Sequence, residues 1–141
     1  MRRAGLLIVG VVMAATLVFA SVAIAERLTG TSGPDFISGS SGDDKIAGGA
    51  GDDALRGRGG DDRMSGDSGD DGMNGNKGKD RLFGNSGNDL MRGGRGDDYI
   101  NAIDHGEVDG VRCGRGDADK AFIDRRDRVR GGGCEQVFRR S

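Results

Sequence analysis

The chain has 141 residues, a formal net charge of −2 and a hydrophobic content of 34%, and 29 of its residues are glycine. A chain of this length forms one small domain at most, and its mildly acidic charge argues against a nucleic-acid partner. Much of the apolar content lies in the first 25 residues. The remainder is too polar and too glycine-rich to fold by hydrophobic burial alone, so a further stabilising contribution is required.

Residues 1–25 have the pattern of a secretory signal peptide. Two arginines follow Met1, an almost wholly apolar run extends to Ala20, and Ala23-Ile24-Ala25 supplies small residues before Glu26. We therefore expect cleavage after residue 25 and a secreted, extracellular protein. The alternative is a membrane anchor through uncleaved residues 4–25, because that stretch approaches the length of a membrane span.

After a leader at residues 26–29, the chain repeats every nine residues from Gly30 to Asn101, without an insertion or a gap. The eight units read GTSGPDFIS, GSSGDDKIA, GGAGDDALR, GRGGDDRMS, GDSGDDGMN, GNKGKDRLF, GNSGNDLMR and GGRGDDYIN. Positions 1 and 4 are always Gly, position 6 is always Asp, and position 8 is always Ile, Leu or Met. A period kept through eight units predicts a solenoid in which every unit forms the same structural element.

Each unit consists of six turn-prone residues followed by three that favour a strand. Glycine at positions 1 and 4 permits left-handed or otherwise restricted backbone angles, so the chain can reverse and turn its carbonyls inward. Position 8 carries the one apolar residue that faces inward. These residues are Ile37, Ile46, Leu55, Met64, Met73, Leu82, Met91 and Ile100. Such residues are buried only if the strands stack into two facing parallel sheets, so two units form one turn of a right-handed coil and eight form four turns.

Stacking of the turns places the position 6 aspartates in two columns. We expect Asp35, Asp53, Asp71 and Asp89 on one side, and Asp44, Asp62, Asp80 and Asp98 on the other. Carboxylates one strand spacing apart, about 4.8 Å, repel each other unless a cation lies between them. Backbone carbonyls of the glycine loops add further oxygen ligands, and such an all-oxygen site favours calcium over zinc or copper. Three gaps in each column predict about six Ca²⁺ ions.

The units resemble the haemolysin-type, or repeats-in-toxin, nonapeptide G-G-x-G-x-D-x-U-x over residues 30–101. The resemblance implies an all-β fold, a right-handed parallel β-roll that binds calcium. It also implies that the eight position 6 carboxylates bind the ions together with loop carbonyls. The carbonyls expected to do so belong to Gly39, Gly48, Gly57, Gly66, Gly75, Gly84 and Gly93. Position 2 departs from the family's glycine in six units, which loosens individual sites without removing the position 6 ligand.

Five units carry a second acid at position 5, namely Asp43, Asp52, Asp61, Asp70 and Asp97. We interpret these residues as solvated loop charges rather than as direct ligands. Together with the aspartate columns they make the calcium-free chain repel itself. The chain is therefore expected to be disordered without calcium and to fold on binding it, because metal affinity is then folding free energy.

The nine-residue register ends after Asn101, and residues 102–141 are expected to form a terminal cap. Apolar residues such as Val111 and Phe138 are available to cover the open end of the coil. Four aspartates of this tail are interpreted as surface charge rather than as a further calcium site: Asp109, Asp117, Asp124 and Asp127. Cys113 and Cys134, the two cysteines of the chain, are expected to form one disulfide, since an exported protein meets oxidising conditions.

Two outward aromatic residues, Phe83 and Tyr99, share a sheet in the expected roll. We expect them to receive the tail; the alternative is a contact patch for a partner.

These features predict a secreted calcium-ion-binding protein that is not an enzyme. The segments outside the signal and the repeats are too short for a catalytic domain, the chain has one histidine, and no nucleophile–base pair or small-molecule cofactor site is evident. The expected partners are calcium ions, with no nucleic acid and no small-molecule substrate. The alternative function is a cell-surface adhesion or interaction module that uses the calcium-stabilised roll as a scaffold for an unknown protein partner.

Overall fold

The computed structural model describes residues 25–104, 107–131 and 133–140, and the expected signal peptide lies almost wholly outside these residues. The described part of the chain is all-β and contains no helix. It therefore has no helix that is long and apolar enough to cross a membrane.

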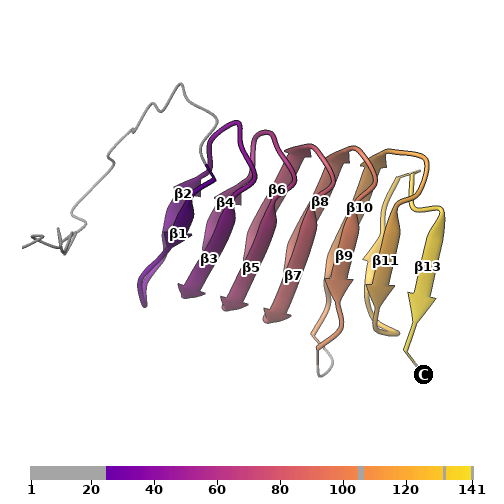
Figure 1. Cartoon of the computed structure of the whole chain (residues 1–141). Helices are drawn as coiled ribbons and strands as arrows, with labels where there is room; N and C mark the ends of the chain where they lie inside the picture. The colour runs from indigo at the N-terminus through magenta and orange to yellow at the C-terminus, as the bar shows by residue number, and fades with distance from the viewer. Residues whose placement is uncertain (1–24, 105–106, 132, 141) are drawn as a thin grey trace, which may run out of the picture.

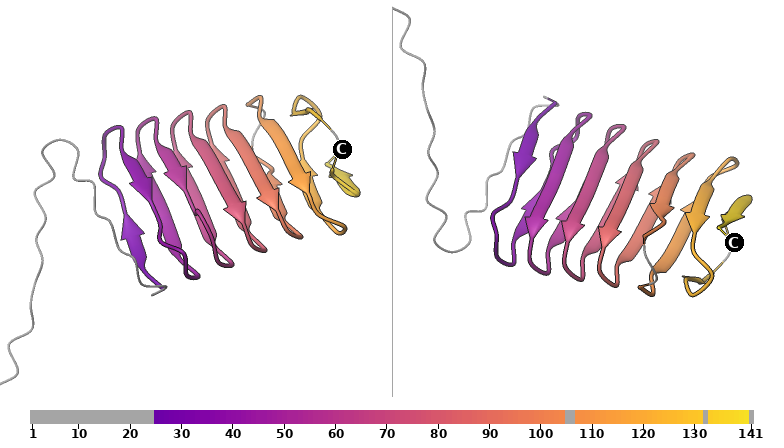
Figure 2. Two further views of the ribbon diagram at one scale, coloured as in Figure 1. Left: turned by 90° about the horizontal axis from the view of Figure 1, so that it is seen from above. Right: turned by 90° about the horizontal axis from the view of Figure 1, so that it is seen from below.

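Successive strands alternate between two parallel sheets that face each other (Figure 1). Sheet A consists of β1 (Arg27–Thr29), β3 (Lys45–Ala50), β5 (Arg63–Ser68), β7 (Arg81–Ser86), β9 (Tyr99–Ala102), β11 (Lys120–Ile123) and β13 (Gln136–Arg139). Sheet B consists of β2 (Phe36–Ser38), β4 (Ala54–Arg56), β6 (Gly72–Lys77), β8 (Leu90–Arg95), β10 (Gly110–Arg115) and β12 (Arg128–Val129). Figure 2 shows the successive turns stacked in one direction. The fold is the expected parallel β-roll.

The register of the sheets follows the repeat. Ile46 lies opposite Met64 in sheet A, and Leu55 lies opposite Met73 in sheet B, so position 8 of each unit faces position 8 of the unit two places later. Two units therefore form one turn. The roll has about six turns rather than the expected four, because β1 precedes the repeats and β10–β13 follow them.

The core between the sheets is one side chain deep. Seven of the eight position 8 residues, from Ile46 to Ile100, are at most 2% exposed, while Ile37 in the first turn is partly buried. Burial of each such side chain contributes about 1.5–3 kcal/mol. Each turn of 18 residues contributes only two such side chains to the core. The core alone is therefore a weak source of stability.

The tail continues the roll instead of covering its end. Val111 lies opposite Met91, and Ala121 lies opposite Ile100, so the core extends without interruption beyond residue 101. The nine-residue register fails there because the connections lengthen. The equivalent aspartates Asp89 and Asp109 are 20 residues apart, against 18 within the repeats. The strands still stack, since extra residues in a connection do not change the sheet register.

Cys113 of β10 and Cys134 lie with their sulfur atoms 1.96 Å apart, at bonding distance. They are 21 residues apart in the chain. A bond between them therefore links one turn of the roll covalently to the next.

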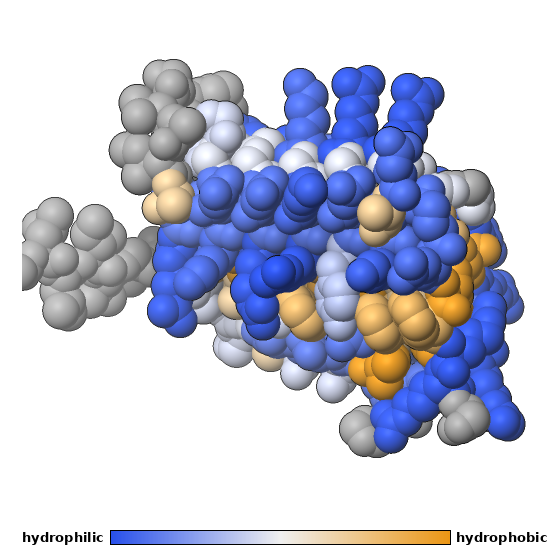
Figure 3. Space-filling view, turned by 45° about the vertical axis from the view of Figure 1, so that its right-hand side comes forward, coloured by the Kyte–Doolittle hydropathy of each residue, from blue (hydrophilic) through white to orange (hydrophobic). Residues whose placement is uncertain are grey.

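The tail packs on the outward aromatic residues, as expected. The Tyr99 ring lies 6.0 Å from the Phe83 ring and 5.0 Å from the ring of Phe122 in the tail, and Phe122 stacks on Phe138 at 4.7 Å. Figure 3 shows apolar side chains gathering toward the C-terminal end of the roll. Val137 and Phe138 remain 41% and 46% exposed.

Candidate metal centre

The position 6 aspartates form two columns, one along each edge of the roll. Each column is joined by hydrogen bonds: the backbone N–H of Asp44 donates to Asp62 Oδ1 at 2.8 Å, and the N–H of Asp53 donates to Asp71 Oδ1 at 2.8 Å. The same bond recurs along both edges, and its members are the expected Asp35, Asp53, Asp71 and Asp89, and Asp44, Asp62, Asp80 and Asp98. Seven of the eight side chains are buried, and Asp35, in the first turn, is partly exposed.

The second oxygen of most of these carboxylates has no hydrogen-bond partner in the described part of the chain. This Oδ2 is buried and unpartnered in Asp53, Asp62, Asp71, Asp80, Asp89 and Asp98. An isolated buried charge is costly. Desolvation accordingly raises the pKa of Asp62, Asp89 and Asp98 to about 7, and the pKa of Asp71 and Asp80 to about 6. The metal-free fold thus disfavours the charged state of these side chains.

The first two units satisfy this oxygen differently. The backbone N–H and the hydroxyl of Thr31 donate to Asp35 Oδ2 at 2.6 and 2.9 Å, and those of Ser40 donate to Asp44 Oδ2 at 2.6 and 3.1 Å. Both donors occupy position 2 of their units. A hydroxyl residue at position 2 therefore gives hydrogen bonds to the carboxylate oxygen that has no partner in the later units.

In the later units position 2 has a left-handed backbone. Gly49 and Gly94 adopt positive φ, as do four residues that are not glycine: Arg58, Asp67, Asn76 and Asn85, with φ between 74° and 84°. Left-handed φ is readily accepted by glycine, tolerated by asparagine and aspartate, and strained in arginine. The structure thus explains why glycine, asparagine or aspartate suits position 2 and why Arg58 does not.

Position 1 requires glycine for space. A Cβ atom on Gly57 would collide with Asp62 Oδ2 and lie 2.7 Å from the carbonyl oxygen of Gly75, and neither glycine has positive φ. The unpartnered carboxylate oxygen and a backbone carbonyl oxygen from the next turn therefore both lie close to the Cα of Gly57, where only a glycine leaves them room. We call this pair of oxygens beside a position 1 glycine the oxygen cradle.

The cradle recurs along the roll. The carbonyl oxygens of five expected glycines lie in it, each beside the position 1 glycine one turn earlier: Gly48, Gly57, Gly66, Gly75 and Gly84. Beside Gly93 and Asp98 the equivalent carbonyl belongs to Cys113. The carbonyls of Gly39 and Gly93 remain predicted ligands.

The donors of the cradle fit calcium. The described residues hold no group of three or more His, Cys, Asp and Glu side chains able to bind a metal ion, so backbone oxygens would have to complete any site. Four cradles, beside Gly48, Gly57, Gly66 and Gly93, combine an unpartnered carboxylate oxygen with a carbonyl oxygen. Ca²⁺ takes these hard ligands in irregular, flexible geometries. The donor set of these cradles therefore fits calcium.

The position 5 acids are more than solvated charges. The backbone N–H of Asp61 donates to Asp43 Oδ1 at 2.7 Å, and that of Asp70 donates to Asp52 Oδ1 at 3.0 Å. Here the donor lies one turn later than the acceptor, whereas in the position 6 columns it lies one turn earlier. The two sets of hydrogen bonds therefore run in opposite directions along the roll, and both join the loops of neighbouring turns.

Four acids of the tail extend the position 6 columns. The N–H of Asp89 donates to Asp109 Oδ1 at 2.7 Å, and that of Asp98 donates to Asp119 Oδ1 at 2.7 Å. Asp127 and Glu135 then accept the same bond from Asp109 and Asp119. The expectation of surface charge is therefore wrong for Asp109 and Asp127, which are 1% and 4% exposed; Asp117 is exposed and Asp124 is partly buried.

A shorter pattern in the sequence marks these missed residues. Asp109-Gly110-Val111, Asp119-Lys120-Ala121 and Asp127-Arg128-Val129 each repeat positions 6 to 8 as Asp-x-apolar. The Oδ2 atoms of Asp109 and Asp119 are also buried and unpartnered in the described structure.

Comparison with known proteins agrees with this geometry. Residues 24–55, 38–73 and 74–102 match the RTX calcium-binding nonapeptide repeat, which is defined as four copies of the unit. These matches together cover more than half of the chain, which therefore belongs to the family of RTX calcium-binding repeat proteins. No curated protein and no solved structure gives a match.

Proposed function

We propose that this protein is exported and that its roll folds on binding calcium. The observation that carries the proposal is the row of buried Oδ2 atoms that have no partner among the described residues. A polypeptide does not keep such oxygens buried and charged without compensation. Calcium supplies that compensation when it is bound, because it neutralises the carboxylates and replaces their lost hydration.

The proposed ligands are the Oδ2 atoms of the position 6 aspartates and the position 1 carbonyls of the following turn. Six repeat aspartates have the unpartnered oxygen, and we propose about six ions in the repeats. Asp109 and Asp119 offer the same oxygen in the tail. Asp35 and Asp44 are proposed as the weakest ligands, since Thr31 and Ser40 already donate to them.

The proposed location is outside the cell. Residues 1–25 carry the signal-peptide pattern, and the paired cysteines suit an oxidising compartment, where we propose that Cys113 and Cys134 form a disulfide. Low calcium inside the cell would leave the aspartate columns self-repelling and the chain unfolded during export. Higher extracellular calcium would then set the fold.

Far-UV circular dichroism of the chain from Glu26 onward tests the proposal. A calcium titration is expected to give a cooperative transition from coil to β-structure that excess chelator reverses, and magnesium at equal concentration is expected to be much weaker. A spectrum that is the same with calcium and with chelator would refute calcium-dependent folding. The midpoint of the titration would distinguish a calcium sensor from a permanently saturated structural site.

A second candidate function is a cell-surface interaction module that uses the roll as a scaffold. It is favoured by the aromatic stack that ends in the partly exposed Phe138 beside Val137. Phe138→Ser is expected to leave the calcium titration unchanged. It would reduce retention of the protein on the producing cells if this surface contacts a partner, and unchanged retention would argue against that role.

A further inference from the structure

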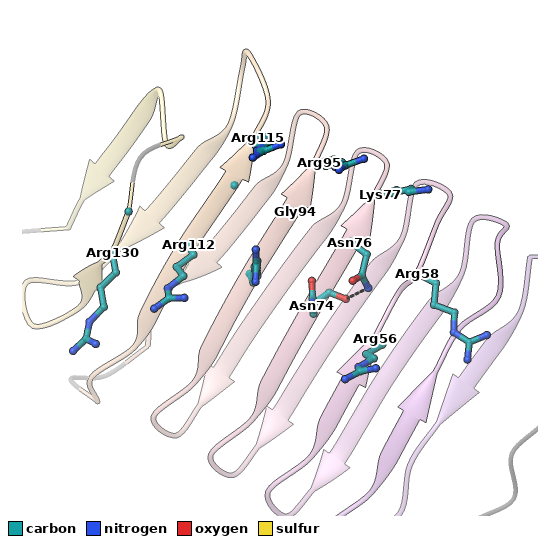
Figure 4. Close-up of a pocket in the computed structure, with 13 residues that line it drawn as sticks. Arg56, Arg58, Asn74, Asn76, Lys77, Gly94, Arg95, Arg112, Arg115 and Arg130 are labelled. Carbon is teal, nitrogen blue, oxygen red and sulfur yellow. Dashed lines mark hydrogen bonds between the residues drawn. The ribbon is translucent and has the colours of Figure 1, made fainter.

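The outer face of sheet B carries a groove lined by cationic side chains (Figure 4). One row follows the last residue of the repeat across neighbouring strands, where Arg56, Asn74, Arg92 and Arg112 lie in register and Arg130 continues the row. Neighbouring members of a row are about 4.8 Å apart, the strand spacing. The row therefore runs along the axis of the roll, across the strands.

A second row of cations borders the other side of the groove. Lys77, Arg95 and Arg115 lie opposite one another on β6, β8 and β10. Figure 4 shows these three side chains along one side of the groove, and Arg56, Arg112 and Arg130 along the other.

From β6 to β10 the strip between the two rows is lined by small residues, whereas Arg58 occupies the equivalent position 2 at the β4 end of the groove. Asn76, Gly94 and Gly114 occupy it, and the Asn76 side-chain amide donates to the backbone carbonyl of Asn74 at 3.1 Å. Because the middle residues are small from β6 to β10, the long cationic side chains there form two walls rather than one continuous layer. The result is a straight channel that follows the axis of the roll and is open to solvent.

The charges of the groove are not neutralised within the described part of the chain. The one ion pair between described side chains joins Lys79 and Asp97, and neither of these lines the groove. Arg56 lies over the Phe36 ring, 5.6 Å from its centroid, which does not reduce its charge. Like charges at strand spacing destabilise a sheet. A row of such charges is therefore best explained by a linear ligand that carries repeated negative charges.

We propose that this groove binds a linear acidic polysaccharide, whose sulfate or carboxylate groups meet the two cationic rows. Arginine presents a planar fork of donors that pairs with such anions in two parallel hydrogen bonds. The amides of Asn74 and Asn76 suit the hydroxyl groups of a sugar. A slender chain fits a channel with low-profile middle residues and two cationic walls.

Two other polyanions fit the groove less well. No aromatic or large apolar side chain lines it, so it lacks both the stacking surface of single-strand nucleic-acid sites and the apolar residues that enter a membrane. The whole chain is acidic, with a net charge of −2, and acids such as Asp52 and Asp70 lie exposed in the loops beside sheet B. A wide duplex, whose two backbones would lie close to these acids, is therefore disfavoured relative to a slender polysaccharide chain.

The test compares the calcium-loaded protein with a triple variant that carries Arg92→Gln, Arg95→Gln and Arg112→Gln. A matched control carries Lys45→Gln, Arg81→Gln and Lys120→Gln, which remove the same charge from exposed positions of sheet A. Titration calorimetry with a heparin oligosaccharide and with a hyaluronan fragment measures binding to sulfate and to carboxylate. Neutral dextran and a single-stranded oligonucleotide serve as the other probes.

We expect one or both acidic oligosaccharides to bind, with an affinity that falls as salt rises. The groove variant should weaken this binding about tenfold or more, and the control variant should not. Both variants should keep the calcium titration of the parent, which shows that they fold. Equal loss in the two variants, no binding of either oligosaccharide, or tighter binding of the oligonucleotide would each overturn the proposal.

Discussion

A single methyl group at position 1 of one repeat is expected to remove one calcium site. In Gly57→Ala the added Cβ collides with Asp62 Oδ2 and lies 2.7 Å from the Gly75 carbonyl oxygen, where ordinary contacts lie at 3.4–4 Å. The methyl group would therefore occupy the cradle in which the two oxygens converge. Neither oxygen can move away freely, because Asp62 Oδ1 accepts the Asp44 N–H and the Gly75 carbonyl accepts the Arg58 N–H at 3.1 Å.

The expected cost has two parts. Overpacking of a tight site costs about 1–3 kcal/mol. Loss of an ion present at 100 times its dissociation constant removes a further stabilisation of about 2.7 kcal/mol. Gly57→Ala should therefore lower the free energy of unfolding in calcium by about 4–6 kcal/mol, and by the smaller packing contribution alone in chelator.

Gly59→Ala provides the matched control within the same loop. The nearest heavy atom to a Cβ there is Ser41 Cα at 4.0 Å, and the backbone is not left-handed. This variant should be neutral or gain about 0.4–1 kcal/mol through the unfolded state. Calorimetry counts the ions and chemical denaturation gives the free energies. If Gly57→Ala binds as many ions as Gly59→Ala with equal affinity, the assignment of the cradle as the calcium site is refuted.

Three further changes test other parts of the structure. Arg58→Gly relieves a left-handed arginine at φ 84° and should raise the unfolding free energy by about 1 kcal/mol in denaturation experiments, more than Asn76→Gly, since asparagine tolerates φ 78°. Asp89→Asn keeps the Oδ1 acceptor but removes the charge and the unpartnered oxygen, so it should bind one ion fewer by calorimetry; Asp70→Asn, an exposed position 5 residue, should bind the full number. Burial raises the pKa of Asp89 to about 7 and that of Asp109 to about 8, so the calcium-free roll binds protons more tightly than the unfolded chain. The free energy of unfolding of the calcium-free roll should therefore rise as pH falls from about 8.5 to about 5. Circular dichroism in chelator measures this, and less β-structure at the lower pH would contradict it.

The repeat predicted the parts of the fold that depend on spacing alone. An unbroken nine-residue period defines which residues share a face, so the position 8 core and the two aspartate columns followed from counting. The same period predicted that equal positions of alternate units, such as Ile46 and Met64, lie side by side. Local backbone geometry was harder to predict. Position 4 has positive φ in the last six units, and position 1 needs glycine for space, but the sequence shows only that both are glycine.

The strands of the tail could not be predicted from a fixed nine-residue period. Its strands still pair in register, but 20 and 21 residues separate Asp89 from Asp109 and Asp98 from Asp119. In a solenoid the sheets constrain the strands and leave the lengths of the connections free. The hydroxyl donors at Thr31 and Ser40 were missed for a different reason, since their effect depends on the direction in which a backbone amide points.

The hydroxyl residues Thr31 and Ser40 predict that the roll assembles from its N-terminal end. In a stack of identical turns each turn contacts only its neighbours. Formation of the first turn is therefore the least favourable step in free energy, because each later turn packs on a turn that is already folded. At the N-terminal end Thr31 and Ser40 supply hydrogen bonds where other loops leave a bare oxygen. That end is therefore expected to depend less on calcium than the later turns, and we expect it to form first as the ion becomes available.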